Sequence, residues 1–218
     1  MFVYLHKSDL RMAIQAILTG DIVNSTRLGT GREKKLMKRL QQIFNKNKLE
    51  FYRGDSFQAF VDDATVALQT ALLCRTYAIS LSDEKTGDSF DVRVSIAAGK
   101  TKTPVKALSV SNGEHFVLSG RAFDEMIKTE KRLAIITSHP LANIGLEVIA
   151  DYINAIFSTL TRKQAEVIFE LLQGKTQQMV AYKFKKSKST INQHVSASRW
   201  PEIEVLLKQY ENIINQLT

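Results

Sequence analysis

Two aspartates, Asp21 and Asp55, stand in sequence settings that favour metal or phosphate chemistry. Asp21 follows an apolar run that ends in Gly20, and Asp55 follows Gly54 between two segments of β character. A carboxylate at a strand end and another on an adjacent hairpin can share a divalent cation, and Mg²⁺ held in this way usually also binds phosphate groups. Each aspartate can equally serve a turn. The pair predicts a site for Mg²⁺ and a nucleotide or phosphorylated small molecule, with two turn aspartates as the alternative.

A second set of polar side chains, near the C-terminus, has the chemistry of DNA recognition. Asn and Gln can pair with adenine, Ser and Thr reach bases or phosphates, and Lys reaches phosphate or guanine. A helix N-terminus adds backbone N–H groups that favour a phosphate. The predicted DNA contacts are Thr176, Gln177, Lys186, Ser187, Lys188, Ser189, Thr190, Asn192, Gln193 and Arg199. A helical module that does not bind DNA is the alternative.

The pattern around these residues predicts a helix-turn-helix. Thr161 has the character of an N-cap for one helix and Thr176 for a second helix over 177–184, and residues 185–187 form a short polar turn. A further helix runs from residue 188 or 189 through 195, which is the arrangement in which the second helix enters the major groove of DNA. The residues expected to face inward are Met179, Val180, Ala181, Phe184, Ile191 and Val195.

Upstream of residue 160, strands and helices alternate in the pattern. Gly54-Asp55 between two β-rich runs predicts a hairpin. The expected strands are 12–23, 50–53, 56–61, 90–98, 105–110 and 133–137. The expected helices are 31–47, one capped by Asp62-Asp63, and 119–130. This order predicts an α+β domain with a mainly antiparallel sheet and helices on one face.

The domain organisation follows from the change of pattern near residue 160. We expect an α+β domain over residues 1–140, a connecting helix over 141–160 and an all-α helix-turn-helix domain over 161–218. The length of 218 residues suits one large domain or two small ones.

Composition and charge narrow the class of protein. With 44% hydrophobic residues and a single cysteine, the chain can build a core but no intramolecular disulfide. No apolar stretch approaches the length of a membrane span, and residues 1–13 lack a signal-peptide core, so we expect a cytoplasmic protein without membrane contact. The net charge is +8, and between Leu171 and Pro201 there is no acidic residue. Such clustering favours a polyanionic partner.

Several motifs resemble known families. The run L-T-R-K-Q-A-E-V-I-F-E-L-L-Q-G, with S-K-S-T-I-N-Q-H downstream, resembles the helix-turn-helix of response-regulator and sigma-factor families. The runs L-T-G-D-I-V-N-S-T, G-D-S-F-Q-A-F and V-R-V-S-I-A-A-G resemble class III nucleotide cyclases. In that family the two aspartates, here Asp21 and Asp55, bind a metal pair with help from the next carbonyl, here that of Ile22. The resemblance implies a cyclase/ferredoxin-like domain.

The chain departs from the cyclase pattern at three positions. Phe51 stands where the family has a purine-reading Lys, and Asp124 and Lys128 stand where it has the Asn and Arg that stabilise the transition state. A carboxylate at position 124 would repel the negative charge that needs stabilising. The resemblance therefore implies the fold more strongly than the activity.

Taken together, the motifs from about Ala13 to Arg199 resemble the SatD family, which combines a small α/β domain with a C-terminal helix-turn-helix. The leading hypothesis is a DNA-binding regulator with a nucleotide-sensing or dimerising domain. The alternative is a divergent metal-dependent cyclase or a nucleotidyl or phosphoryl transferase, and a protein-binding scaffold is a third possibility. The candidate ligand-binding residues are Arg53, Arg121, Asp124 and Lys128. We expect a homodimer, because cyclase-type sites lie between protomers and a single helix-turn-helix usually needs a partner.

Overall fold

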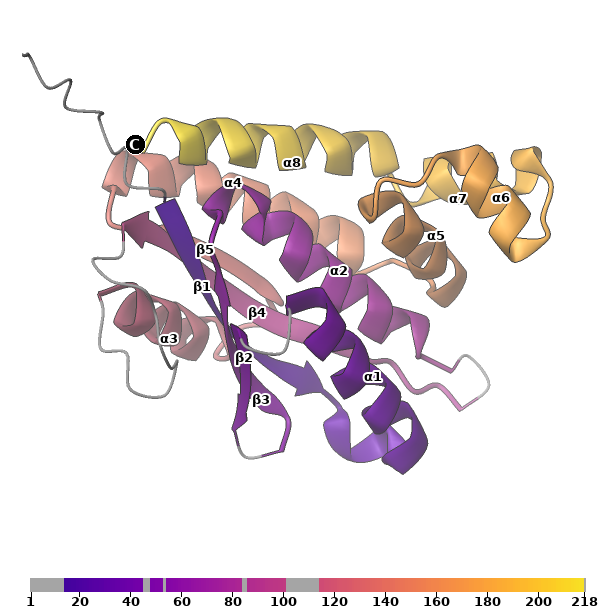
Figure 1. The fold of residues 1–218 in the computed structure, drawn as a ribbon, viewed down its shortest axis with the longest axis horizontal. Helices are drawn as coiled ribbons and strands as arrows, with labels where there is room; N and C mark the ends of the chain where they lie inside the picture. Colours follow the sequence, from indigo (N-terminus) through magenta and orange to yellow (C-terminus); the bar gives the residue numbers. More distant parts are fainter. Residues whose placement is uncertain (1–13, 45–47, 53, 84–85, 101–113, 218) are drawn as a thin grey trace, which may run out of the picture.

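A five-stranded sheet forms the centre of the molecule (Figure 1). The computed structural model describes residues 14–44, 48–52, 54–83, 86–100 and 114–217. The strands are β1 (Ile14–Val23), β2 (Leu49–Tyr52), β3 (Ser56–Val61), β4 (Asp91–Lys100) and β5 (Leu133–Thr137). Their order across the sheet is β2-β3-β1-β4-β5, and only the β4–β5 pair is parallel among the described strands. The prediction of an α+β domain with a mainly antiparallel sheet is confirmed.

Strand β1 lies at the centre of the sheet and ends beside the β2–β3 hairpin. In its register Asp21 lies opposite Ser56 of β3 and Arg93 of β4. A Cβ atom at Gly20 would lie 2.6 Å from the Phe57 ring and 2.7 Å from the Arg93 carbonyl oxygen. Only glycine fits there without displacing a neighbouring strand, so Gly20 allows the close approach of Phe57 and Arg93 just before Asp21.

Helices cover both faces of the sheet, and the prediction of helices on one face was wrong. Helices α1 (Gly29–Phe44), α2 (Ala67–Ser80) and α4 (Pro140–Phe157) share the main core with Leu18. Helix α3 (Glu114–Met126) lies on the opposite face, where Phe116 packs with Ile17 and Phe60 (Figure 1). The reason is that successive side chains of β1 are apolar on both sides, which is the pattern of a strand buried on both faces.

Helix α3 begins five residues earlier and ends four residues earlier than predicted. Its first turn is fixed against the sheet, since the His115 ring occupies the space that a side chain at Gly99 would fill. His115 also lies within hydrogen-bonding distance, 3.1 Å, of the Lys100 carbonyl. Arg53 and the predicted strand 105–110 lie outside the described residues.

Four further helices follow α4. They are α5 (Arg162–Leu172), α6 (Gln177–Phe184), α7 (Lys188–Ala197) and α8 (Trp200–Asn215). Two of these helices begin at threonine caps that the sequence predicted. Thr176 accepts a hydrogen bond from the Met179 N–H at 3.3 Å, and Thr161 forms a capping box with Gln164. Gly174 ends the first of them with φ +79°.

The helical segment and the α+β domain share one apolar core. Helix α5 packs on α2, and α8 packs on α4 and on the short 3₁₀ helix η3 (Ala64–Val66). Tyr210 donates a hydrogen bond to the Ala64 carbonyl at 2.8 Å, and Gln69 donates one to the Leu172 carbonyl at 2.6 Å. Residues on both sides of position 160 therefore belong to one continuous core, and the domain boundaries stay a prediction. No helix in the described part of the chain has the length and apolarity to cross a membrane.

Candidate functional site

Asp21 and Asp55 come together at one end of the sheet. The Ile22 N–H donates a hydrogen bond of 3.1 Å to the Asp55 carbonyl, which ties the hairpin tip to the end of β1. The Asp55 carboxylate accepts a 2.7 Å hydrogen bond from the Ser25 hydroxyl. The hairpin turn that presents Asp55 depends on Gly54, whose φ of +89° is unfavourable for other residues.

A tight turn after β1 places Ser25 against Asp55. Asn24 adopts the left-handed conformation with φ 59°, and its side-chain amide donates a 2.7 Å hydrogen bond to the Ser89 carbonyl. Asparagine tolerates this conformation better than most residues. The chain then continues as the 3₁₀ helix η1 (Ser25–Arg27), so the sequence D-I-V-N-S returns Ser25 to the hairpin.

Several groups act on the pKa of the Asp21 carboxyl group in opposite directions. Burial raises the pKa of its carboxyl group, the positive charge of Arg93 lowers it, the neighbouring Asp55 raises it and Arg132 lowers it; the net pKa lies above the usual value. The Arg93 Nε atom lies 3.5 Å from Asp21 Oδ1. Both atoms are buried and form no hydrogen bond within the described part of the chain. The Asp21 side chain is 24% exposed while its Oδ1 atom is buried, so only the rest of the carboxyl group is open to a further ligand.

The donor set fits Mg²⁺ only when the ion arrives with a phosphate group. Asp21 and Asp55 offer two carboxylates, and no third His, Cys, Asp or Glu joins them in the described residues. Mg²⁺ commonly takes one or two carboxylates together with substrate phosphates. Because Arg93 already compensates part of the charge of Asp21, a free-standing metal centre does not fit this arrangement.

Among the predicted ligand residues that the structure describes, none of the others joins Asp21 and Asp55. Arg121 and Asp124 are exposed on α3, and Lys128, beyond its end, is paired with Glu125 at 2.6 Å. Three residues that the sequence reasoning missed do belong to the site: Ser25, Arg93 and Arg132. Ser25 lies inside the motif around Asp21. Arg93 could be recognised only from its position opposite Asp21 in β4, and that position is known only once the sheet register is known.

Helix α7 presents a polar surface to solvent. Lys188, Ser189, Asn192 and Gln193 are exposed, and Thr190 is half-buried. Their orientation is fixed from the other side, since Ile191 and Val195 are buried in the core as predicted. Ser187 caps the helix by accepting the Thr190 N–H at 3.0 Å. Lys186 and Thr176 are exposed and Gln177 is half-buried.

Glu170 on α5 neutralises two of the lysines in the basic window. Its side chain is only 5% exposed and accepts hydrogen bonds from Lys175 and from Lys183, the latter at 2.6 Å. Burial acts to raise the pKa of this carboxyl group, but the hydrogen bonds and charges of the two lysines lower it by more. Fewer unpaired positive charges are therefore available to a partner than the sequence indicated.

The remaining lysines gather at the turn between α6 and α7. Lys185, Lys186 and Lys188 are exposed and form no ion pair with any described residue. They line a hollow of about 540 Å³ together with Tyr182, which is 88% exposed. Lys185 adopts φ 52° at the end of α6, which turns the chain sharply between the two helices.

Two predicted residues of this module have other positions. Arg199 contacts α4, where its guanidinium group donates a hydrogen bond to Tyr152 and lies 4.9 Å from the centre of that ring. It also bonds Glu202 at 3.1 Å. Met179, which we expected to face inward, is 54% exposed, because α6 packs through Val180 and Ala181 instead.

The comparisons with known proteins assign no family to this chain. No family model matches it, and no curated protein matches it. Among solved structures, the active GGEEF domain of a diguanylate cyclase from Vibrio cholerae aligns with 58% of this chain and 84% of that chain, at 9% sequence identity and a TM-score of 0.44. A likeness this distant carries no functional argument, and membership in the SatD family stays a prediction from the motifs.

Proposed function

We propose that this protein is a DNA-binding regulator whose helices α6 and α7 form a helix-turn-helix that reads double-stranded DNA. The observation that carries the proposal is the exposed face of α7, where Ser189, Asn192 and Gln193 adjoin lysines without acidic partners among the described residues. A second helix with this chemistry suits the major groove, because its amides can pair with base edges while lysines contact the flanking phosphates.

The α+β domain would serve this regulator as a sensor for a nucleotide or a phosphorylated metabolite. Asp21 and Asp55, with the Ile22 carbonyl, would hold a Mg²⁺ ion that arrives with the phosphate groups, and the ion would neutralise phosphate charge. Arg93 and Arg132 would lie close enough to affect that charge balance. The cyclase-like motifs of the sequence support this assignment.

Binding without turnover is favoured by the groups that surround this site. The positions of the family's transition-state residues hold Asp124, which is exposed, and Lys128, which is paired with Glu125. Neither supplies the preorganised positive charge that phosphoryl chemistry requires. A divergent nucleotidyl or phosphoryl transferase is the second candidate, supported by the proximity of the Asp21 and Asp55 carboxylates.

A homodimer would give the helix-turn-helix the two-fold symmetry that such readers use. Helix α4 carries a row of exposed apolar residues at helical spacing: Leu141 is 83%, Ile144 65% and Val148 64% exposed. Rows of this kind are uncommon on surfaces that face only water. We assign this row to contact with a second copy of the chain. Ile144→Glu with Val148→Glu should convert a dimer to a monomer in light scattering, and an unchanged mass would rule out this surface.

The DNA assignment is tested by fluorescence anisotropy with a mixed pool of labelled duplexes. Wild-type protein should bind at low salt, and its affinity should fall steeply as salt rises, because phosphate contacts release counterions. In duplexes selected from the pool, Asn192→Ala with Gln193→Ala should cost about 1–3 kcal/mol for each lost base contact while non-specific binding persists. Binding that does not depend on salt would contradict the proposal.

The two candidate functions separate in a second measurement. Each nucleoside triphosphate is incubated with the protein and Mg²⁺ or Mn²⁺, and products are followed by chromatography. The sensor hypothesis predicts binding that Asp55→Asn abolishes, without product. Turnover that Asp55→Asn abolishes would favour the enzyme instead.

A further inference from the structure

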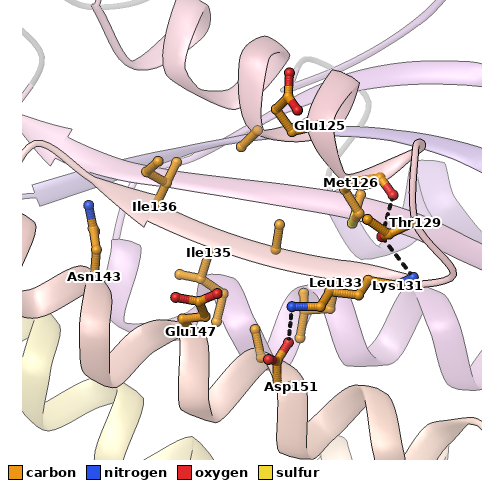
Figure 2. A pocket seen from close by; sticks show the side chains of 13 residues that line it. Glu125, Met126, Thr129, Lys131, Leu133, Ile135, Ile136, Asn143, Glu147 and Asp151 are labelled. Atoms are coloured by element: carbon orange, nitrogen blue, oxygen red, sulfur yellow. Dashed lines mark hydrogen bonds and ion pairs between the residues drawn. The ribbon is translucent and has the colours of Figure 1, made fainter.

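A cavity of about 300 Å³ lies at the open edge of the sheet, between α3, β5 and α4 (Figure 2). Strand β5 runs through it, with Glu125 and Met126 of α3 on one side and Glu147 and Asp151 of α4 on the other (Figure 2). Neither Asp21 nor Asp55 lines this cavity, and no residue of α7 does. It is therefore separate from both surfaces that the proposed function uses.

The hydrogen-bond ladder determines which backbone groups of β5 face the cavity. The Val94 N–H of β4 donates to the Arg132 carbonyl at 2.9 Å, and β5 pairs with β4 in parallel. In a parallel ladder, alternate residues direct both their N–H and their C=O toward the neighbouring strand. Ala134 and Ile136 therefore face β4, and the N–H and C=O of Ile135 point to the open edge.

Two asparagines of α4 occupy the outer edge of β5 on either side of Ile135. Asn143 accepts from the Thr137 N–H at 2.8 Å and donates to the Thr137 carbonyl at 3.0 Å. Asn154 donates to the Leu133 carbonyl at 2.9 Å. They leave no room for a continuous added strand.

Ile135 has no such partner. Its backbone N–H and C=O form no hydrogen bond on the open side with any described residue, although the residue is only 7% exposed. Leaving a buried donor and acceptor unpaired costs about 1–3 kcal/mol for each group. In an extended residue these two groups lie side by side and point the same way, so they present an adjacent donor and acceptor.

The walls of the cavity are apolar and its rim has little free positive charge. The apolar lining residues are Ala122, Met126, Leu133, Ala134, Ile136 and Ala150. Lys131 is paired with Asp151 at 2.6 Å, and Glu125 is paired with Lys128. Glu147 is exposed at the rim and forms no ion pair with a described residue. The site therefore disfavours a phosphate.

We propose that this cavity binds a flat, uncharged ring with an adjacent hydrogen-bond acceptor and donor, of the nucleobase or carboxamide type. The ring lies between the apolar side chains of α3 and α4. Its acceptor receives the Ile135 N–H, and its donor bonds the Ile135 carbonyl. The cavity volume is at the small end of the range for ligand sites and suits a single ring system.

The test uses ¹⁵N-labelled full-length protein and follows the Ile135 amide signal during titration. The probes are adenine and nicotinamide, each up to about 2 mM, a range that detects weak ligands. One or both should shift the Ile135 signal. 6-Dimethylamino-9-methylpurine, which has no N–H donor, should bind at least tenfold more weakly than adenine. If neither probe shifts Ile135, the cavity holds only water and the proposal is overturned.

Matched variants identify the site. Ala122→Leu and Ala134→Leu fill the cavity from two sides and should each weaken binding at least tenfold, with melting temperature measured to confirm folding. Ala155→Leu adds the same group on the exposed face of α4 and should change nothing. Undiminished binding by both filling variants would overturn the proposal.

Two further controls separate the outcomes. Asp55→Asn should leave this binding intact, which distinguishes it from the phosphate site at Asp21 and Asp55. Competition by an extended Val-Thr-Val-Thr-Val peptide that shifts the side-chain amides of Asn143 and Asn154 would overturn the proposal in favour of strand addition.

Discussion

The carboxylate site at the end of β1 and the lysine-rich turn between α6 and α7 treat charge in opposite ways. At the first, Asp21 is partly buried beside Arg93, and Asp55 is bonded to Ser25, so the chain itself supplies most of the partners. At the second, Lys185, Lys186 and Lys188 are exposed and have no acidic partner within the described residues. Buried charge finds partners in its own fold, whereas exposed, unpaired charge is available to another molecule.

Glu170 separates the lysines that are paired within the fold from those that are exposed and unpaired. It lies only five residues before Lys175, yet it is buried and takes up both Lys175 and Lys183. Two of the positive charges in the basic window thus stabilise the helical segment. The neighbouring lysines at the turn remain for a partner.

The largest expected effect comes from reversing the unpaired charges. Lys186→Glu with Lys188→Glu should weaken binding of a duplex roughly a hundredfold or more at moderate salt, because attraction to phosphates becomes repulsion. Anisotropy titration measures this change. The matched control is Lys34→Glu with Lys35→Glu, an equal charge change on exposed positions of α1. Equal losses of DNA affinity in both variants would mean that net charge alone governs binding and that the lysines of the α6–α7 turn have no special role.

Removing the buried carboxylate should have the next largest effect, on stability. Glu170→Gln leaves two lysines without their partner and should lower the free energy of unfolding by about 1.5–3 kcal/mol at pH 7. Denaturant unfolding measures the change. Glu166→Gln, in a surface pair with Arg162 on the same helix, should cost less than about 1 kcal/mol.

The pH dependence of Glu170 gives this prediction a sign. Since the folded-state pKa is lowered, the stabilisation is present above the ordinary pKa of 4.5 and is lost as the pH falls through the folded-state pKa. The gap between wild type and Glu170→Gln should therefore close in acid. A gap that is constant down to pH 3 would mean that the lysine pairs contribute nothing.

Asp21 should behave in the opposite sense, with the smallest effect. Because its folded-state pKa is raised, ionisation opposes folding, and the penalty grows as the pH rises above the ordinary value of 3.8. Asp21→Asn should stabilise the protein by about 0.5–2 kcal/mol at pH 7, with no gain in strong acid. Thermal unfolding across pH measures this difference, and Asp124→Asn at an exposed position of α3 is the control. Destabilisation at pH 7 would show that Asp21 serves the fold through Arg93.

Local signals in the sequence predicted much of the fold. The β2–β3 hairpin follows from Gly54-Asp55 between two β-rich runs, and α5 and α6 start at the threonine caps that the pattern indicated. Helix α3 was displaced because its first turn is determined by the fit of His115 over Gly99, a contact with a different strand. Arg75 is a similar case: it is 1% exposed and pairs with Asp91 at 2.7 Å, and no local pattern distinguishes it from a surface arginine.

The sequence by itself determined the helix caps, the hairpin and the motif positions of Asp21, Asp55 and the polar residues of α7. These features depend on backbone preferences and on hydrogen bonds within a few residues, so they can be predicted from the local sequence alone. The tertiary structure alone decided that helices cover both faces of the sheet, that Arg93 lies beside Asp21, that Glu170 accepts hydrogen bonds from two lysines and that Ile135 faces a cavity. Each of these depends on which distant segments pack together, because burial and pairing are properties of the assembled core.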